Sequence, residues 1–476
     1  MEYEVVMGLE VHVELATESK LFCSCSAKFG AEANENVCPA CAGMPGMLPA
    51  VNKRAIELGI IAGLLTNCEI TRTITFDKKN YFYPDLPTGY QITQLYAPIC
   101  RNGFVEIETG AGKKKIRIKQ IHIEEDAGKL VHDYRTGSSL VDFNRAGVPL
   151  VEIVSQPDFR SSDEVIAYLE KLRALFSFAG VSDCRMQEGS MRCDVNISVR
   201  KAGSKELGVR TEIKNLNSLK AIARAIEYET DRHISAIETG CEELVQETRR
   251  WDDNSGETYP MRNKEDATDY RYFPNPEILP VHISEEWISE VKSGIPELPH
   301  EKYERLTKEY GLSDYDSKLI TGSKNISDIF DRTMEYVNNP KEVANWIIGD
   351  LASIAREENV PGDEIRIDCE KFGKVIKMVE NRVINRTIGK KVLQLVFRED
   401  MDPEIYVREN RLGMIADTGY LEDLVREVIA ANEKSVLEYK AGNQKVISFF
   451  MGQIMKRTQG KADPAAVNSI LKKMLS

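Results

Sequence analysis

Apolar and polar residues alternate along three segments of the first 200 residues, which is the pattern of strands with one buried face. These segments cover residues 9–15, 120–129 and 193–199. A fourth segment, 150–154, is apolar except for Glu152. Regular alternation is typical of antiparallel sheets. We therefore expect these segments to be strands of a mainly antiparallel sheet.

The polar positions of these segments are rich in acids and histidines. They include Glu10, His12, Glu14, His122, Glu124, Glu152 and Asp194, and the acids Glu125 and Asp126 follow directly after Glu124. Carboxylates a few ångströms apart repel one another, and a bound divalent cation removes that cost. For any single strand, an ordinary solvated face is the better explanation. The recurrence of the pattern in four segments favours a cation site.

Apolar stripes with helical spacing predict helices between the strands. Residues 55–61 are typical of a buried helix. Ser161 and Glu164 have the spacing of a capping box at the start of another helix. A long helix is predicted over residues 219–237, where His233 is a core or surface residue and not a ligand.

Prolines, glycines and aromatic residues mark the segments expected to be irregular. We predict loops over residues 76–94 and 246–280, because turn-forming residues interrupt any regular pattern there. A long ordered loop with exposed polar and aromatic groups is more often functional than not. The glycines of residues 110–113 lack the spacing of a phosphate-binding loop and predict a hairpin turn.

The sequence changes character at residues 294–299, where two prolines flank a break in the pattern. Beyond this linker, helical patterns extend to about residue 398 and resume at about residue 406. Asp463 followed by Pro464 is expected to begin the last helix. A chain of 476 residues should contain several domains. We predict domains at 1–293, 294–404 and 405–476.

The composition, with 42% hydrophobic and 29% charged residues, is that of a soluble globular protein. The net charge of −12 argues against generic coating of nucleic acid, so DNA is not an expected partner and RNA binding requires a local basic patch. Such a patch lies near the C-terminus, at Lys456, Arg457, Lys461, Lys472 and Lys473. The N-terminal sequence predicts neither a signal peptide nor a membrane span, and hence a cytoplasmic location.

Ten cysteines in a cytoplasmic protein are expected to be reduced, buried or bound to metal. Four of them form two close pairs, Cys23 with Cys25 and Cys38 with Cys41. Two such pairs joined by a short loop match a tetrahedral zinc site with four thiolate ligands. A site with four protein ligands is closed, so this zinc knuckle (residues 23–41) would be structural. The alternative is a group of free thiols in a turn.

A series of motifs follows in order over the first 280 or so residues. Besides the cysteine pairs, they are GLEVHVEL, KNYFYPDLPTGYQI, HIEEDAGK, VDFNRAGVPLVEIV, MQEGSMRCDVNISV, EIKNLNS, QETRRWD and DYRYFPNP. Together they closely resemble the family of B subunits of aspartyl/glutamyl-tRNA amidotransferases. The C-terminal sequence GQIMKRTQGKADPAAVNSILKKML is similar to the small helical tail of that family. The resemblance therefore covers nearly the whole chain.

The resemblance implies an α+β fold, with a mainly antiparallel β-sheet cradle domain followed by a helical domain and a small helical tail that binds tRNA. It also implies a ligase that forms a C–N bond. Members of the family use ATP and Mg²⁺ to phosphorylate the side-chain carboxylate of Glu or Asp misattached to tRNA, and ammonia then displaces the phosphate. The implied partners are a glutamine-hydrolysing amidase (the A subunit), a small third protein (the C subunit) and the misacylated tRNA.

The resemblance also implies roles for individual residues. The magnesium ligands would be Glu10, His12, Glu124, Glu125, Glu152 and Asp194. The residues near the exit of the ammonia path would be Lys79, Tyr81 and Glu125, and those contacting nucleotide or phosphate would be Arg145, Arg192 and Lys214. The alternative is a non-catalytic adaptor that binds tRNA through its basic tail and contains a zinc knuckle and a structural magnesium.

Overall fold

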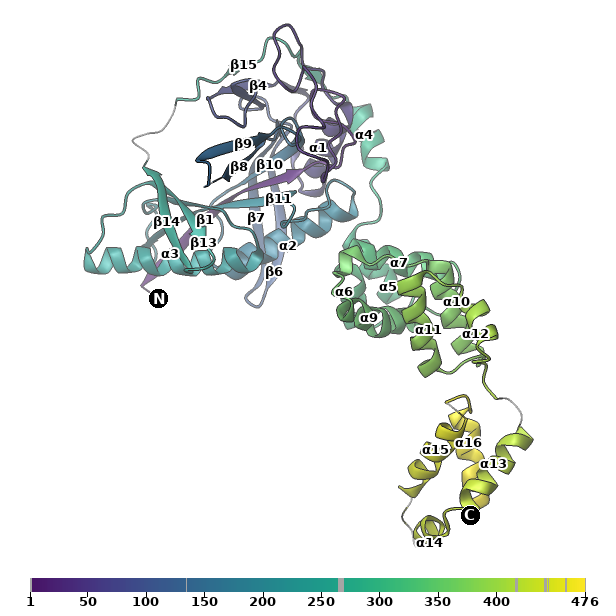
Figure 1. The fold of residues 1–476 in the computed structure, drawn as a ribbon. Coiled ribbons are helices and arrows are strands. Elements are labelled where there is room, and N and C mark those ends of the chain that lie inside the picture. Colours follow the sequence, from purple (N-terminus) through teal and green to yellow (C-terminus); the bar gives the residue numbers. More distant parts are fainter. Residues whose placement is uncertain are drawn as a thin grey trace. The chain divides into compact units, whose positions relative to one another are not determined.

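The computed structural model describes residues 2–133, 135–263, 269–415, 418–440, 443, 445–458 and 460–475. The chain divides into two compact units, Met1–Leu298 and Pro299–Ser476. Every strand that the structure describes lies in the first unit, and the second is helical (Figure 1). A mainly antiparallel sheet followed by helices confirms the predicted α+β class. Among the described residues, none of the helices combines the length and apolarity that crossing a membrane requires.

A nine-stranded sheet forms the centre of the first unit, in the order β14-β13-β12-β11-β1-β10-β7-β6-β2. All neighbours are antiparallel except β12 and β13, which are parallel. The strands are β1 (Tyr3–Glu14), β2 (Glu69–Ile70), β6 (Cys100–Thr109), β7 (Gly112–Glu125), β10 (Pro149–Ser155), β11 (Met191–Lys201), β12 (Thr211–Lys214), β13 (Glu247–Asp252) and β14 (Glu257–Asn263).

The four segments predicted as strands overlap β1, β7, β10 and β11, although β7 ends at Glu125, before the end of the predicted segment 120–129. These four strands are neighbours in the order β11-β1-β10-β7. Because paired residues of adjacent strands point to the same face, their polar side chains form one continuous surface. Their apolar side chains enter a single core on the opposite face. The predicted turn at residues 110–113 is confirmed by the pairing of Thr109 with Gly112 between β6 and β7.

Three helices contribute to the core of this unit: α1 (Lys53–Leu65), α2 (Ser162–Phe178) and α3 (Leu219–Thr239). Each confirms a predicted helix, and Figure 1 shows α2 and α3 lying against the sheet. The Ser161 side chain caps α2 by accepting a hydrogen bond from the backbone nitrogen of Glu164. His233 of α3, predicted to be a core or surface residue, is fully buried in the core.

Two segments predicted as loops contain strands, so that prediction was wrong in part. Residues 76–94 contain β4 (Asp77–Asn80) and β5 (Tyr90–Thr93), which form a three-stranded sheet with β15 (Phe273–Pro274). Residues 246–280 contain β13, β14 and β15. Strand pairing overrides the local turn-forming residues, both within each segment (β4 with β5, β13 with β14) and with the distant strands β15 and β12. Residues 264–268 of the second segment lie outside the described residues.

The remaining elements of the first unit are two small pairs of strands and one helix. They are β3 (Thr73–Ile74) with β16 (Val281–His282), β8 (Lys129–Asp133) with β9 (Ser138–Asp142), and α4 (Glu285–Ser293).

The second unit contains two separate hydrophobic cores. The first is formed by α5 (Pro299–Lys308), α6 (Asp314–Thr321), α7 (Lys324–Met334), α8 (Pro340–Asn345), α9 (Ala352–Glu357), α10 (Cys369–Glu380), α11 (Arg386–Glu399) and α12 (Pro403–Glu409), with a π-helix at Trp346–Leu351 and a 3₁₀ turn at Gly362–Glu364. The second is formed by α13 (Thr418–Ala430), α14 (Glu433–Lys440), α15 (Val446–Arg457) and α16 (Pro464–Leu475). Asp463 caps α16 by accepting a hydrogen bond from the backbone nitrogen of Ala465, as predicted.

Candidate functional site

The polar face of the nine-stranded sheet carries a row of four paired side chains. His122 of β7 pairs with Glu152 of β10, Glu152 with His12 of β1, and His12 with Arg192 of β11. Residues paired in this way project from the same face of a sheet. The register therefore brings together, across four strands, residues that lie up to 180 positions apart in the sequence.

The first acid cluster is built on this row. His122 Nε2 lies 2.6 Å from Glu152 Oε2, and His12 Nε2 lies 3.7 Å from both Glu124 and Glu152 oxygens. One ligand atom from each of His12, Glu124 and Glu152 lies within 4.8 Å of the other two. Thr93 orients the Glu124 carboxylate by donating a hydrogen bond of 3.0 Å. Oxygen and imidazole donors at this separation could hold a divalent cation.

Charges in the first cluster stabilise one another. Burial opposes the charged form of His122, but the adjacent Glu152 carboxylate outweighs this effect and raises the pKa of the imidazole. Burial likewise opposes ionisation of Glu152, yet the charge and hydrogen bond of His122, assisted by His12 and Lys79, hold its pKa well below the usual range. Glu152 therefore remains ionised near neutral pH and available as a ligand.

The second acid cluster consists of Glu10 of β1, Asp194 of β11 and Glu212 of β12, with one oxygen from each within 4.8 Å of the others. Lys214 Nζ lies 2.5 Å from Asp194 and 2.8 Å from Glu212. Burial and the charge of Glu152 raise the pKa of Glu10. The two acid clusters therefore lie close enough to influence each other electrostatically.

Glu212 was not among the predicted site residues, although the alternation of its segment is typical of a strand. Residues 211–214 alternate in the same way as the predicted strands, with Ile213 and Thr211 buried. The strand is only four residues long, which is too short for a firm assignment from its pattern. In the structure, the hydroxyl of Thr248 on β13 donates a hydrogen bond of 2.8 Å to the Glu212 carboxylate.

Glu125 was predicted as a metal ligand, but of the described residues it belongs to neither acid cluster. It follows Glu124 at the end of β7, and its carboxylate accepts a hydrogen bond of 2.9 Å from the backbone nitrogen of Ile92 on β5. Burial raises the pKa of Glu125 to about 7, against the effect of this hydrogen bond. Successive strand residues point to opposite sides, which separates Glu125 from its neighbour.

Lys79 of β4 and Tyr81 lie within electrostatic range of the first acid cluster, because the charge of Lys79 lowers the pKa of Glu152, and burial together with the charges of Asp85 and Glu124 raises the pKa of Tyr81. Lys79 Nζ is 5.7 Å from the centre of the Tyr81 ring and 5.0 Å from that of Tyr270. Tyr272 stacks edge-on against Tyr270 at 6.1 Å, and its pKa is raised by burial and by the charges of Glu124 and Glu152. Tyr270 and Tyr272 were not predicted as site residues, although their motif DYRYFPNP is rich in aromatics.

Arg145 and Arg192, predicted to contact phosphate, meet at a single carboxylate. Each donates a hydrogen bond of 2.7 Å to the same oxygen of Asp126. Arg145 also lies 2.8 Å from Glu14. Burial opposes ionisation of Asp126, but the two guanidinium groups outweigh it and lower the pKa of the carboxyl. The arginines are thus held beside the first acid cluster, with Asp126 as their shared partner.

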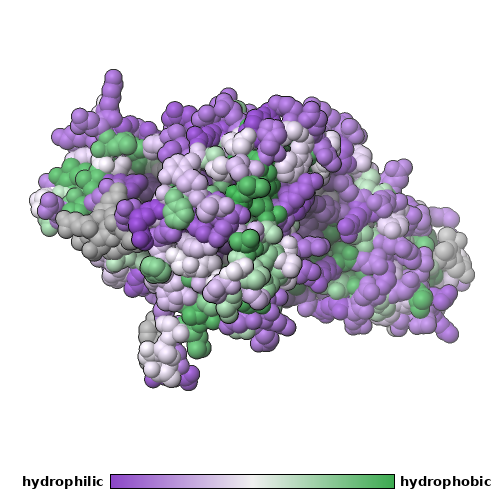
Figure 2. Space-filling view, turned by 90° about the horizontal axis from the view of Figure 1, so that it is seen from above, coloured by the Kyte–Doolittle hydropathy of each residue, from purple (hydrophilic) through white to green (hydrophobic). Residues whose placement is uncertain are grey.

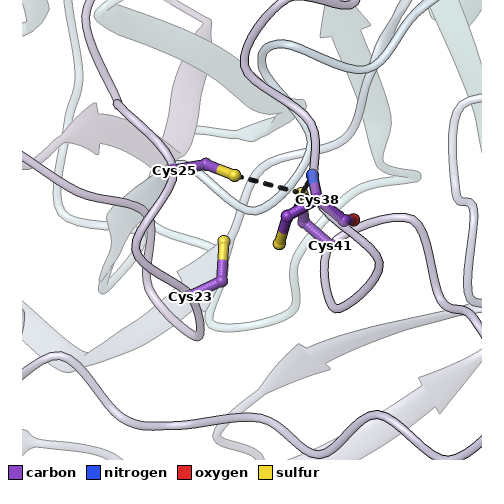
Figure 3. A group of neighbouring side chains, drawn as sticks. All are labelled: Cys23, Cys25, Cys38 and Cys41. Carbon is purple, nitrogen blue, oxygen red and sulfur yellow. Dashed lines mark hydrogen bonds between the residues drawn. The ribbon is translucent and has the colours of Figure 1, made fainter.

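The four predicted zinc ligands come together in one group, drawn in Figure 3. The sulfur of Cys41 lies 3.8 Å from that of Cys38 and 4.0 Å from that of Cys25, and all four sulfurs lie within 4.8 Å of one another. A tetrahedron with zinc–sulfur bonds of about 2.3 Å separates its sulfurs by about 3.8 Å, so the group fits a zinc ion.

Lys20, which is buried, contacts one of the four cysteines of the zinc knuckle. Its ammonium lies 3.6 Å from the sulfur of Cys41. Hydrogen bonds from Cys23 and the Cys38 backbone, together with the Lys20 charge, outweigh burial and lower the pKa of the Cys41 thiol to about 4. The thiolate form that a metal requires is therefore favoured at this position.

The basic residues predicted to bind RNA all belong to the body formed by α13–α16. Lys456 and Arg457 end α15, Lys461 follows it, and Lys472 and Lys473 lie in the last turn of α16. Arg457 is paired with Glu427 at 3.3 Å and Lys473 with Glu422 at 3.9 Å. Four of the five are exposed and Lys461 is half-buried, so their charges are accessible from solvent.

Two family models match the chain. The GatB/GatE catalytic domain matches residues 5–289, the part that contains both acid clusters and the zinc knuckle. The GatB domain matches residues 328–475. The chain belongs to the GatB family. This confirms the resemblance seen in the sequence motifs.

Curated relatives match over the full length of the GatB chain. Proteins described as the B subunit of aspartyl/glutamyl-tRNA(Asn/Gln) amidotransferase are 52% identical in Lachnoclostridium phytofermentans, over 100% of this chain and 99% of theirs, and 52% identical in Agathobacter rectalis, over 99% of each chain. The protein of that description from Thermoanaerobacter pseudethanolicus is 50% identical over 100% of both chains.

Proposed function

We propose that this GatB chain is the component of a tRNA-dependent amidotransferase that activates the side-chain carboxylate of Glu or Asp misattached to tRNA. The observation that carries this proposal is the pair of acid clusters on one face of the sheet. They are assembled from five strands, all within the residues that match the catalytic domain. A face that concentrates this many carboxylates suits metal-assisted phosphoryl transfer.

The chemistry requires an activated carboxylate, because a free carboxylate resists attack by ammonia. A carboxylate oxygen of the misacylated residue attacks the γ-phosphorus of ATP, forming an acyl phosphate while the bond to ADP breaks. Ammonia, released from glutamine by a partner protein, then attacks the carbonyl carbon. The C–O bond to phosphate breaks, phosphate leaves, and a proton is lost from nitrogen to give the amide.

The acid clusters would hold Mg²⁺, which supplies charge neutralisation on the phosphates during transfer. The ligands in the first cluster would be His12, Glu124 and Glu152, and those in the second Glu10, Asp194 and Glu212. Lys214, held between Asp194 and Glu212, would place its ammonium beside the phosphate chain. Arg145 and Arg192, placed by Asp126, would add positive charge on the other side.

Ammonia is proposed to arrive past Lys79, Tyr81 and Glu125. Support comes from the position of Lys79 and Tyr81 near the first acid cluster and from a cavity of about 240 Å³ beside the zinc knuckle. Glu125, Asp126 and Tyr90 line this cavity, together with Cys41. The cavity therefore connects the surroundings of Glu125 with the knuckle.

The proposed partners are the amidase (the A subunit), the small third protein (the C subunit) and misacylated tRNA, in the cytoplasm. The surface shown in Figure 2 is mostly hydrophilic but carries separate hydrophobic patches. Phe29, Phe82 and Leu279 are 78%, 87% and 82% exposed. A contiguous exposed apolar patch is typical of a surface that a partner covers. The tail with Lys456, Arg457, Lys461, Lys472 and Lys473 would bind the tRNA backbone.

The test is transfer of labelled γ-phosphate from Mg-ATP by the assembled complex, with and without misacylated tRNA. Glu124→Gln and Glu10→Gln each remove a charged ligand, so we expect transfer to fall at least 100-fold while glutamine hydrolysis by the partner survives. Glu106→Gln, an exposed acid on β6, is the matched control and should transfer normally. Normal transfer by the two cluster variants, or tRNA binding without any transfer, would favour the adaptor alternative.

A further inference from the structure

A guanidinium group and an aromatic ring lie together at the edge of the nine-stranded sheet. Arg250 of β13 pairs with Lys214 of β12 on one side and with Tyr259 of β14 on the other. The guanidinium carbon of Arg250 lies 5.8 Å from the centre of the Tyr259 ring. Both side chains are exposed, Tyr259 to 38%. Neither has a place in the function proposed so far.

The pair projects from the same face as the acid clusters. Residues on either side of Arg250 point the opposite way: Arg249 and Trp251 are buried, and Trp251 packs against Tyr228 of α3. Because α3 lies on the core face, Arg250 and Tyr259 must lie on the other. The hairpin is held by a tight turn, in which Asp252 accepts hydrogen bonds from the backbone of Asn254 and Gly256.

The pair extends a row of the sheet that begins in the second acid cluster. Glu10 pairs with Asp194, Asp194 binds Lys214, and Lys214 pairs with Arg250. Neighbouring strands are spaced by about 4.8 Å, so Arg250 lies about 10 Å and Tyr259 about 14 Å from Asp194 along the row. That separation is comparable to the reach from the terminal phosphate to the base of an extended nucleoside triphosphate.

We propose that Arg250 and Tyr259 form a stacking platform for the purine ring of the nucleotide. Guanidinium groups and aromatic rings both bind planar bases by stacking. With the terminal phosphate at the second acid cluster, the phosphate chain passes Lys214 and the base reaches the platform. The inference rests on the proposed function, in which this face of the sheet binds ATP.

Calorimetric titration of the assembled complex with Mg-ATP, and separately with inorganic tripolyphosphate and magnesium, tests the platform. Tyr259→Ala removes the ring, and we expect Mg-ATP to bind about tenfold more weakly, while tripolyphosphate, which has no base, binds as before. Arg250→Ala should weaken Mg-ATP in the same way, and Tyr259→Trp should retain wild-type affinity. Tyr315→Ala, which removes an exposed tyrosine from the second unit, is the control and should change neither affinity.

Unchanged Mg-ATP affinity in both Tyr259→Ala and Arg250→Ala would overturn the platform and leave the proposed function intact. Weaker binding of misacylated tRNA with unchanged ATP affinity would also overturn it, because the ring would then serve an RNA base. Failure of the wild-type complex to bind either ATP or tripolyphosphate would contradict the proposed function itself, and the platform with it.

Discussion

Glu229 of α3 is a fully buried carboxylate that stays charged because its partners surround it. Arg232 Nε lies 3.0 Å away, Arg249 Nε lies 3.2 Å away and His233 Nε2 lies 3.5 Å away, and Thr258 donates a further hydrogen bond. Burial alone would raise the pKa of Glu229, but the hydrogen bonds from His233, Arg232 and Thr258 outweigh burial and lower it to about 2. This network fastens α3 to β13 and β14.

The depressed pKa of Glu229 makes stability depend on pH in a defined direction. Between about pH 4.5 and pH 2 the unfolded chain binds the proton and the folded chain does not, so stability is lost as pH falls through this window and is complete above it. A shift of this size corresponds to roughly 3 kcal/mol. We expect Glu229→Gln to have a lower free energy of unfolding than wild type at pH 6. The difference between the two free energies should become smaller by about 2–3 kcal/mol at pH 2.

Urea unfolding at a series of pH values measures this gap. Glu227→Gln, an exposed acid on the same helix, is the control and should show no such change. A gap between Glu229→Gln and wild type that stays constant from pH 6 to pH 2 would show that Glu229 does not carry this dependence.

At the scale of elements, alternation of polar and apolar residues was sufficient to predict β1, β7 and β11, and an apolar run interrupted by Glu152 predicted β10. The short strands β4, β5, β13 and β14 were missed, because turn-forming residues interrupt their pattern and the pattern does not show which strands they pair with. Register was not predictable either, and register alone decides that His12 meets Glu152 and that Glu10 meets Asp194. Glu212 was missed because its strand, β12, is only four residues long. Among the described residues, Glu125 belongs to neither acid cluster, because it points away from Glu124.

The zinc knuckle is an element that the sequence predicted from cysteine spacing alone. Its four sulfurs are grouped without regular secondary structure around them, so a bound ion is expected to hold the segment together. We expect Cys41→Ser to lose its zinc, from about one ion per chain to nearly none, and to lower the melting temperature of the first unit by several degrees.

Elemental analysis and thermal unfolding of the purified chain check this expectation. Cys241→Ser is the matched control, because Cys241 is exposed and lies outside the group of four. Full zinc content in Cys41→Ser, or zinc loss in Cys241→Ser, would contradict a closed site with four thiolate ligands.

At the scale of the whole molecule, the chemistry and the basic tail lie in different units. Both acid clusters and the knuckle are in the first unit, and the five basic residues of the tail are in the second. The relatives match over both units, so the two units also form a single chain in these relatives. A chain of net charge −12 thus carries a local group of five basic residues in the body formed by α13–α16.

The central claim is that the two acid clusters hold divalent ions where ATP reacts. The most direct measurement is anomalous diffraction from crystals of the complex grown with Mn²⁺, in place of Mg²⁺, and a non-hydrolysable ATP analogue. We expect one peak among His12, Glu124 and Glu152 and another among Glu10, Asp194 and Glu212, with the second lost in Asp194→Asn. Manganese and nucleotide bound together at any other place on the chain would contradict it.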